Sequence, residues 1–191
     1  MKKVLFLFIS LMVCVCGYSQ KHMKFQGIEI DGTKKDFVDQ LVKKGYRYEG
    51  PSDNIEILSG TFTSKKAKVG VLANSAGNVI AVTVSLPEYK EWKTLLNEYN
   101  YYKDLYTQKY GMPVSVNEKD KTINEDNHWK LSYLVEGRNE WECWFETEEG
   151  EILLAIKGLK HDFDDNTGYI TIMYRDKANY KKNQNKDIDD I

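Results

Sequence analysis

The sequence predicts an α+β protein with antiparallel strands, built from two similar units. Three observations support this class. Two segments place apolar residues at three- and four-residue steps, most of the rest alternates with period two, and the alternating segments are joined by short loops. Short loops favour antiparallel pairing, because parallel strands need long crossovers. Each unit is expected to be a helix followed by a small antiparallel meander, and the two can join into one continuous sheet with the helices on one face.

The first helix is predicted to begin near residues 31–33 and to end at Gly45. Thr33 or Asp31 is the candidate N-cap, and Asp36 places a carboxylate beside the free amides of the first turn. Gly45 suits the left-handed cap at the C-terminal end. The apolar stripe of this helix is expected to contain Phe37, Val38, Leu41 and Val42.

The second helix is predicted to follow Pro87. Its apolar and aromatic residues recur at helical spacing and therefore share one face, which is expected to pack on the sheet. Gly111 closes the helix and Pro113 prevents its continuation. The residues of this stripe are Trp92, Leu95, Leu96, Tyr99, Tyr102, Tyr106 and Tyr110.

Period-two patterns predict the strands. In the first half they cover residues 56–63, 68–73 and 79–86, with residues 74–78 as a hairpin loop. In the second half they cover residues 131–135, 141–147, 151–157 and 169–175, with Gly150 in the central turn. In the last strand, Ile170, Ile172 and Tyr174 are expected to face the core, with Thr171 and Arg175 turned away.

The two halves, residues 24–87 and 88–176, show the same order of signals. Each has a helix, a glycine at the helix end and a hairpin with a glycine in its turn. Gly45 corresponds to Gly111, and Gly77 to Gly150. This order predicts an internal repeat within one domain of residues 20–180. We call it a pseudo-repeat, because the pattern of signals is repeated while the residue identities are not. Residues 181–191 are polar and are expected to form a disordered tail.

The first 19 residues are organised like a secretory signal peptide. Two lysines precede an apolar run, and Gly17 and Ser19 provide small residues before a cut after Ser19. A lipoprotein with its lipid on Cys16 or Cys14 is the alternative, although valine precedes each cysteine. We therefore expect a periplasmic or secreted protein, with no membrane span after cleavage.

The expected mature chain is mildly acidic. Cleavage would remove two lysines and no acidic residue, leaving 172 residues with 25 basic and 29 acidic side chains. This balance disfavours nucleic acid or an anionic membrane as partner. Only Cys143 would remain, so no intramolecular disulfide could form. A buried thiol is the preferred interpretation of Cys143, and a catalytic nucleophile is the alternative.

A resemblance to a known architecture supports the two-unit prediction. Tandem units of this kind resemble the β-lactamase-inhibitor-protein-like architecture, shared with the SmpA/OmlA group of envelope proteins. The helix exit at residues 108–113, Gln-Lys-Tyr-Gly-Met-Pro, is similar to an exit common in that group. Residues 22–32 also resemble the start of secreted Bacteroidetes proteins of unassigned function. The resemblance implies a binding or assembly role. Because the disulfides of the inhibitor proteins are absent, inhibition of a β-lactamase does not carry over, and no functional residue is transferred.

Metal and cofactor signals are weak. The acidic loop at residues 161–168 carries oxygen ligands at alternating positions, and Asp162, Asp164 and Asn166 form a weak Ca²⁺ candidate. A solvated turn is the preferred interpretation, because the loop lacks the glycine and glutamate positions of an EF-hand. A transition metal bound through His161 is a further alternative. No cofactor is expected. His22 is expected to lie in a mobile N-terminal segment.

Four residues are candidates for contact with a partner. Tyr101 and Leu105 leave the buried stripe of the second helix and could form an outward patch. Trp144 joins the polar side of its strand, and Trp129 lies in a polar stretch, so either ring could bind a sugar or a protein. Burial of Trp144 under the second helix is the preferred interpretation.

These observations predict a non-enzymatic binding or accessory protein of the cell envelope that acts through protein–protein interaction. A glycan-binding module that uses an exposed tryptophan is the alternative. A small hydrolase is less favoured. Glu142 and Glu146 could serve as its carboxylate pair, but they share the polar side of one strand, as on a solvated face.

Overall fold

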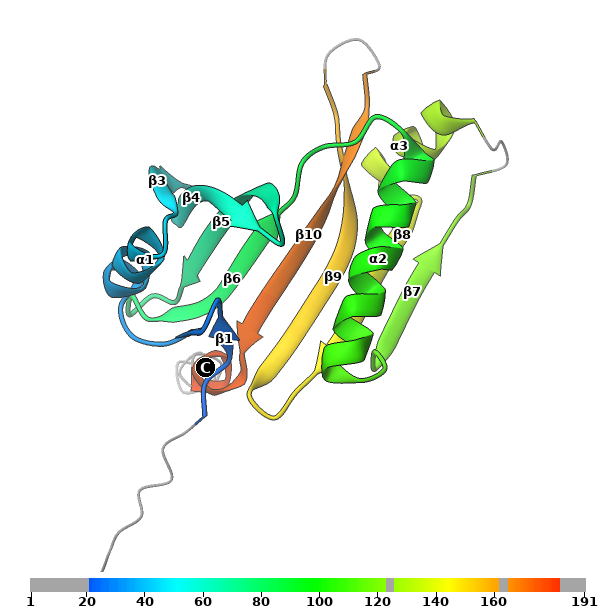
Figure 1. The fold of residues 1–191 in the computed structure, drawn as a ribbon. Coiled ribbons are helices and arrows are strands. Elements are labelled where there is room, and N and C mark those ends of the chain that lie inside the picture. Colours follow the sequence, from blue (N-terminus) through cyan, green and yellow to red (C-terminus); the bar gives the residue numbers. More distant parts are fainter. Residues whose placement is uncertain (1–20, 123–125, 162–164, 183–191) are drawn as a thin grey trace, which may run out of the picture.

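The described part of the protein is built on one large antiparallel sheet, and its three longest helices pack on one face of this sheet (Figure 1). The computed structural model describes residues 21–122, 126–161 and 165–182. Eight strands form the sheet in the order β3-β4-β5-β6-β10-β9-β8-β7, and β1 and β2 form a separate two-stranded hairpin. The sheet strands are β3 (Arg47–Ser52), β4 (Ile55–Phe62), β5 (Lys65–Ala73), β6 (Val79–Ser85), β7 (Ser115–Lys119), β8 (Glu140–Glu146), β9 (Gly150–Leu159) and β10 (Thr167–Asp176). The hairpin strands are β1 (Lys24–Phe25) and β2 (Ile28–Glu29).

The described residues form four helices, of which two begin with a side-chain cap and the longest begins after Glu91 without one. They are α1 (Lys34–Lys43), α2 (Trp92–Tyr110) and α3 (Asn127–Val135), and a short helix over residues 177–182 follows β10. The Thr33 side chain accepts a hydrogen bond from the backbone N–H of Asp36, which confirms Thr33 as the N-cap of α1. Gly45 and Gly111 have φ values of 96° and 86°, so glycine ends both long helices where they were expected to end.

The prediction of two similar helix-plus-sheet units is wrong. The central strands β6 and β10 pair over Thr171↔Ser85 to Arg175↔Ala81, so strands of both halves belong to one eight-stranded sheet. The helices of the halves also differ, because α1 has 10 residues and α2 has 19, and α3 occurs only in the second half. If the two halves were separate units, β6 and β10 would each be an exposed apolar edge strand, and their pairing covers both edges. The tandem architecture suggested by the resemblance is therefore wrong for this chain.

One segment was assigned the wrong secondary structure. Residues 131–135 were expected to be a strand, but they form the end of α3. Asp126 caps this helix by accepting a hydrogen bond from the N–H of His128, and Leu131 and Leu134 turn inward three residues apart. A short apolar run fits a buried strand as well as a buried helix. The pattern also gave no sign of the edge strands β3 and β7.

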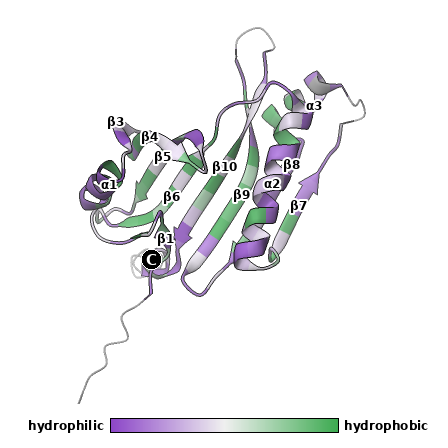
Figure 2. Cartoon of the chain, in the orientation of Figure 1, coloured by the Kyte–Doolittle hydropathy of each residue, from purple (hydrophilic) through white to green (hydrophobic). Residues whose placement is uncertain are grey.

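A single hydrophobic core lies between the sheet and the helices. Figure 2 shows hydrophobic residues concentrated in the central strands β6, β10 and β9. Ile170, Ile172 and Tyr174 face this core, whereas Thr171 and Arg175 point away, as predicted. Val42 was expected in the buried stripe of α1 but is 45% exposed.

The opposite face of the sheet carries half-exposed side chains. Cross-strand pairing places one row of them along the middle of this face, and we call this surface the open face. The row consists of Ile57, Thr83, Met173, Leu153 and Trp144, and the buried Gly70 lies between Ile57 and Thr83.

Candidate functional site

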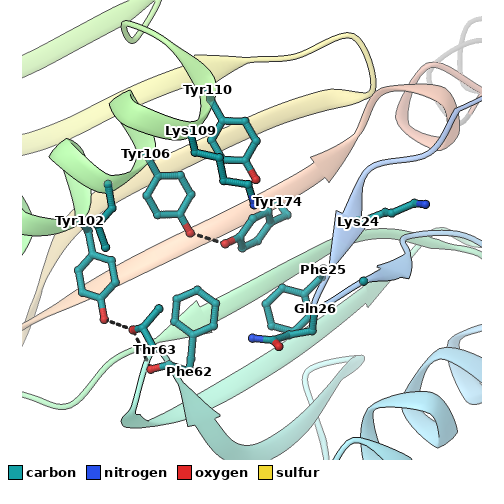
Figure 3. Close-up of a pocket in the computed structure, with 12 residues that line it drawn as sticks. Lys24, Phe25, Gln26, Phe62, Thr63, Tyr102, Tyr106, Lys109, Tyr110 and Tyr174 are labelled. Carbon is teal, nitrogen blue, oxygen red and sulfur yellow. Dashed lines mark hydrogen bonds between the residues drawn. The ribbon is translucent and has the colours of Figure 1, made fainter.

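An aromatic cleft lies on the helical side of the sheet, between α2 and the β1–β2 hairpin (Figure 3). Its volume is about 490 Å³, within the range of small-molecule and side-chain sites. We call it the tyrosine cleft. Its lining consists of Lys24, Phe25, Gln26, Gly27, Phe62, Thr63, Tyr102, Leu105, Tyr106, Lys109, Tyr110 and Tyr174.

Because of its helical periodicity, α2 supplies side chains to both the floor and the rim of the cleft. Tyr102 and Tyr106 are four residues apart and are buried against the sheet. Leu105 and Lys109 lie on the same side of the helix but nearer to solvent. The floor is therefore aromatic, and an aliphatic and a cationic side chain border its opening.

A tight turn builds the opposite wall. Gln26 and Gly27 join β1 to β2 with φ values of 52° and 77°, the left-handed pair of a two-residue hairpin turn. Phe25 is buried beneath this turn, with its ring centroid 6.1 Å from that of Phe62 and 5.4 Å from that of Tyr174. The hairpin is thus fixed by aromatic packing, and its turn stands at the edge of the cleft (Figure 3).

Two hydroxyl pairs cross the floor. Tyr106 is hydrogen-bonded to Tyr174, and Tyr102 to Thr63, as the dashed lines in Figure 3 show. Burial raises the pKa of each of the three tyrosines. The phenols therefore stay neutral at physiological pH and serve as hydrogen-bond donors and acceptors.

The charge of the lining is entirely positive. Lys24 forms an exposed ion pair with Glu29 at 3.3 Å, and the Lys109 ammonium lies 4.8 Å from the centroid of the Tyr110 ring. The twelve lining residues include no Asp, Glu, His or Cys. Such a cleft suits an apolar or aromatic group with neutral or negative polar atoms near its rim.

A buried polar network holds the hairpin against the sheet. The Asp176 carboxylate is fully buried and accepts hydrogen bonds from the backbone N–H of Met23, at 2.7 Å, and of Asn179, at 2.9 Å. It also lies 3.1 Å from the His22 ring, and the other ring nitrogen lies 3.6 Å from Asp31. The expectation that His22 is mobile is therefore wrong, because this network anchors it.

The structure separates the four residues proposed as partner contacts. Tyr101 is 53% exposed on the outer side of α2, whereas Leu105 borders the tyrosine cleft. Trp129 is 46% exposed on α3. Trp144 lies on the open face, away from α2, so its expected burial under that helix is wrong. The Arg175 guanidinium lies 5.2 Å from the centroid of the Trp144 ring.

The residues proposed for metal binding are only partly described. Asp162 and Asp164 lie outside the described residues. Asn166 donates a hydrogen bond to the Ser132 hydroxyl, and His161 contacts Glu88 and Thr167. Within residues 21–122, 126–161 and 165–182, no group of three metal-ligating side chains is assembled. Cys143 is buried, and burial raises the pKa of its thiol.

Sequence reasoning found half of the tyrosine cleft. The stripe of α2 identified the tyrosines of the floor, but it gave no information on the wall opposite. The Gln26-Gly27 pair, placed between Phe25 and Ile28, is the signal that could have predicted the hairpin. That this hairpin lies beside α2 depends on contacts between residues far apart in the sequence.

Comparisons with family models, curated proteins and solved structures find no match for the chain. Among the described residues, no helix has the length and apolarity needed to cross a bilayer. The function is therefore inferred from the site alone.

Proposed function

We propose that this chain is a secreted or periplasmic binding protein of the cell envelope, without catalytic activity, which recognises a partner protein through the tyrosine cleft. The observation that carries the proposal is the aromatic lining with lysines at the rim. Tyrosine is enriched at the centres of protein interfaces, because its ring buries apolar area while its hydroxyl remains hydrogen-bonded. An apolar or aromatic side chain of the partner would occupy the cleft, with acidic groups near Lys24 and Lys109.

The cleft is well prepared for such a role. Phe25 and Phe62 are fixed by ring packing, and the hydroxyls of Tyr102 and Tyr106 are held by partners. Binding would therefore order few additional side chains, which reduces its entropic cost.

Site-specific photocrosslinking tests the proposal. A photoreactive amino acid at Leu105, at the rim, would be compared with the same residue at Lys93, an exposed position near the start of α2. The full chain would be expressed in its native host. We expect one protein to be crosslinked at position 105 and not at 93, and this product to decrease in the Tyr102→Ala variant.

Crosslinking that is equal at both positions, or unaffected by Tyr102→Ala in a folded variant, would contradict the proposal. Circular dichroism and thermal unfolding would show that each variant is folded. Lys93→Ala provides a second control, because this exposed side chain lies on the same helix but outside the cleft lining.

Glycan binding at Trp144 is the second candidate. The ring is half-exposed in a depression of about 270 Å³ that also contains Glu146, Glu151 and Arg175. Carboxylates beside an aromatic ring are common in sugar sites, but here the arginine already packs over the ring. A glycan array probed with the wild-type protein and with Trp144→Ala would test it, since binding by this mechanism disappears in the variant.

A further inference from the structure

A second depression lies on the open face and differs in chemistry from the tyrosine cleft. Its volume is about 750 Å³, and it lies where one end of β4 and β5 approaches the hairpin of β9 and β10. Three basic residues line it, namely Arg47, Lys66 and Lys68. We call it the basic depression.

Strand register brings the basic and hydroxyl side chains together. Arg47 pairs with Ser59, Ser59 with Lys68, and Lys68 with Ser85, so these four form one row across neighbouring strands. Lys66 lies two residues before Lys68 on β5 and therefore points to the same face. Strands are spaced about 4.8 Å apart, which places Arg47 and Lys68 roughly 10 Å apart on either side of the Ser59 hydroxyl.

The positive charges of the basic depression are only partly neutralised by nearby carboxylates. Arg47 pairs with Glu49 at 3.0 Å, and the pKa of Glu49 is lowered by a hydrogen bond from Ser59 and then by Arg47. Lys66 and Lys68 make no ion pair within 4 Å of any carboxylate in the described part of the chain.

The second nearby carboxylate, Glu88, already has other partners. It accepts a hydrogen bond from the Thr167 hydroxyl and lies 2.8 Å from the His161 ring. The charge of Lys68 contributes to the lowered pKa of both Glu49 and Glu88, but no carboxylate of the described residues lies within 4 Å of either ammonium group, so both lysines can still contact an external anion.

The far wall of the depression is apolar. Tyr169 and Leu159 project from β10 and β9 on the open face, and Pro87 closes the end of the wall. Leu159 is 38% exposed, so this wall offers contact area to a ligand. A bare inorganic anion would leave the wall unused.

We propose that the basic depression binds a phosphate monoester, with the phosphate between Lys66, Lys68 and Arg47 and its organic part against Tyr169 and Leu159. Ammonium and guanidinium groups form short, charge-assisted hydrogen bonds to phosphate oxygens, and hydroxyls can complete the shell. The same chemistry occurs in a soluble phosphorylated molecule and in a lipid headgroup. This site is separate from the tyrosine cleft and does not depend on the proposed protein partner.

Calorimetric titration with phenyl phosphate tests whether the basic depression binds a soluble phosphate monoester. We expect binding to be tighter than that of inorganic phosphate, and at least tenfold weaker in the double variant Lys66→Ala/Lys68→Ala. A tenfold loss of affinity corresponds to about 1.4 kcal/mol of binding free energy. Lys93→Ala is the matched control, because it removes an exposed lysine elsewhere on the surface.

Sedimentation with phosphatidylcholine vesicles containing phosphatidic acid tests whether the basic depression binds the phosphate of a lipid headgroup. Binding to these vesicles alone, lost in the double variant, would support the site and assign it to a headgroup. The absence of binding to both probes would overturn the proposal, as would binding that is unchanged in the double variant. Both lysines are exposed, and thermal unfolding would verify that the variant folds.

Discussion

The hydroxyl pair between Tyr106 and Tyr174 allows a quantitative test of how the floor of the tyrosine cleft is stabilised. Both side chains are buried, with 7% and 6% of their surface exposed, and their hydroxyls are hydrogen-bonded to each other. Substitution of either tyrosine by phenylalanine keeps the ring but leaves the other hydroxyl without its partner. An unsatisfied buried hydroxyl costs about 1–3 kcal/mol, so each single variant should lose about that much free energy of unfolding.

The double variant should lose much less than the sum of the two single variants. Replacement of both hydroxyls leaves no unpaired polar group, and such paired replacements are close to neutral. Urea unfolding would be followed by tryptophan fluorescence, since Trp92 and Trp141 are buried and in contact at a centroid distance of 4.7 Å. A double variant whose loss equals the sum of the single losses would refute the reasoning, because it would show that the hydroxyls do not depend on each other.

Three further predictions concern the network at the hairpin, acid stability and the thiol. Asp176→Asn should reduce the free energy of unfolding by about 1–3 kcal/mol in urea titrations, because the amide NH2 group replaces one of the two oxygens that accept hydrogen bonds from buried backbone N–H groups; a loss below about 1 kcal/mol would contradict this role. The pKa of Glu88 is lowered by hydrogen bonds from Thr167 and then His161, so its contribution to stability is present above about pH 4.5 and is lost as the pH falls below that; Glu88→Gln should make stability less dependent on pH in this range. Cys143 is buried with a raised pKa and should react with iodoacetamide only under unfolding conditions; rapid labelling of the native protein would show that the thiol is accessible.

Local signals predicted individual elements well. Thr33 and Gly45 bounded α1 because capping depends on residues within a few positions. The alternation around Ile172 predicted which side of β10 faces the core, since the pleat fixes alternate side chains to opposite faces. The prediction of a strand at residues 131–135 was wrong, because the cap at Asp126 and contacts with distant strands make this apolar run helical.

The candidate site was predictable only in part. Tyr102 and Tyr106 were identified as one helical face, whereas Phe25 and Lys24 belong to a hairpin some eighty residues earlier in the chain. Leu105 was expected to lie on an outward patch with Tyr101, but the hairpin approaches α2 on the side of Leu105.

The sequence by itself determined α1 and α2 with their glycine ends, the alternation of most strands and the burial of Cys143, because these depend on spacing within about ten residues. Only the tertiary structure decided that β6 pairs with β10, that the hairpin closes the tyrosine cleft and that Arg47, Lys66 and Lys68 meet on the open face. Each of these follows from long-range strand pairing and from packing into one shared core. Such contacts depend on which surfaces fit together, and a local pattern of polar and apolar residues does not specify this.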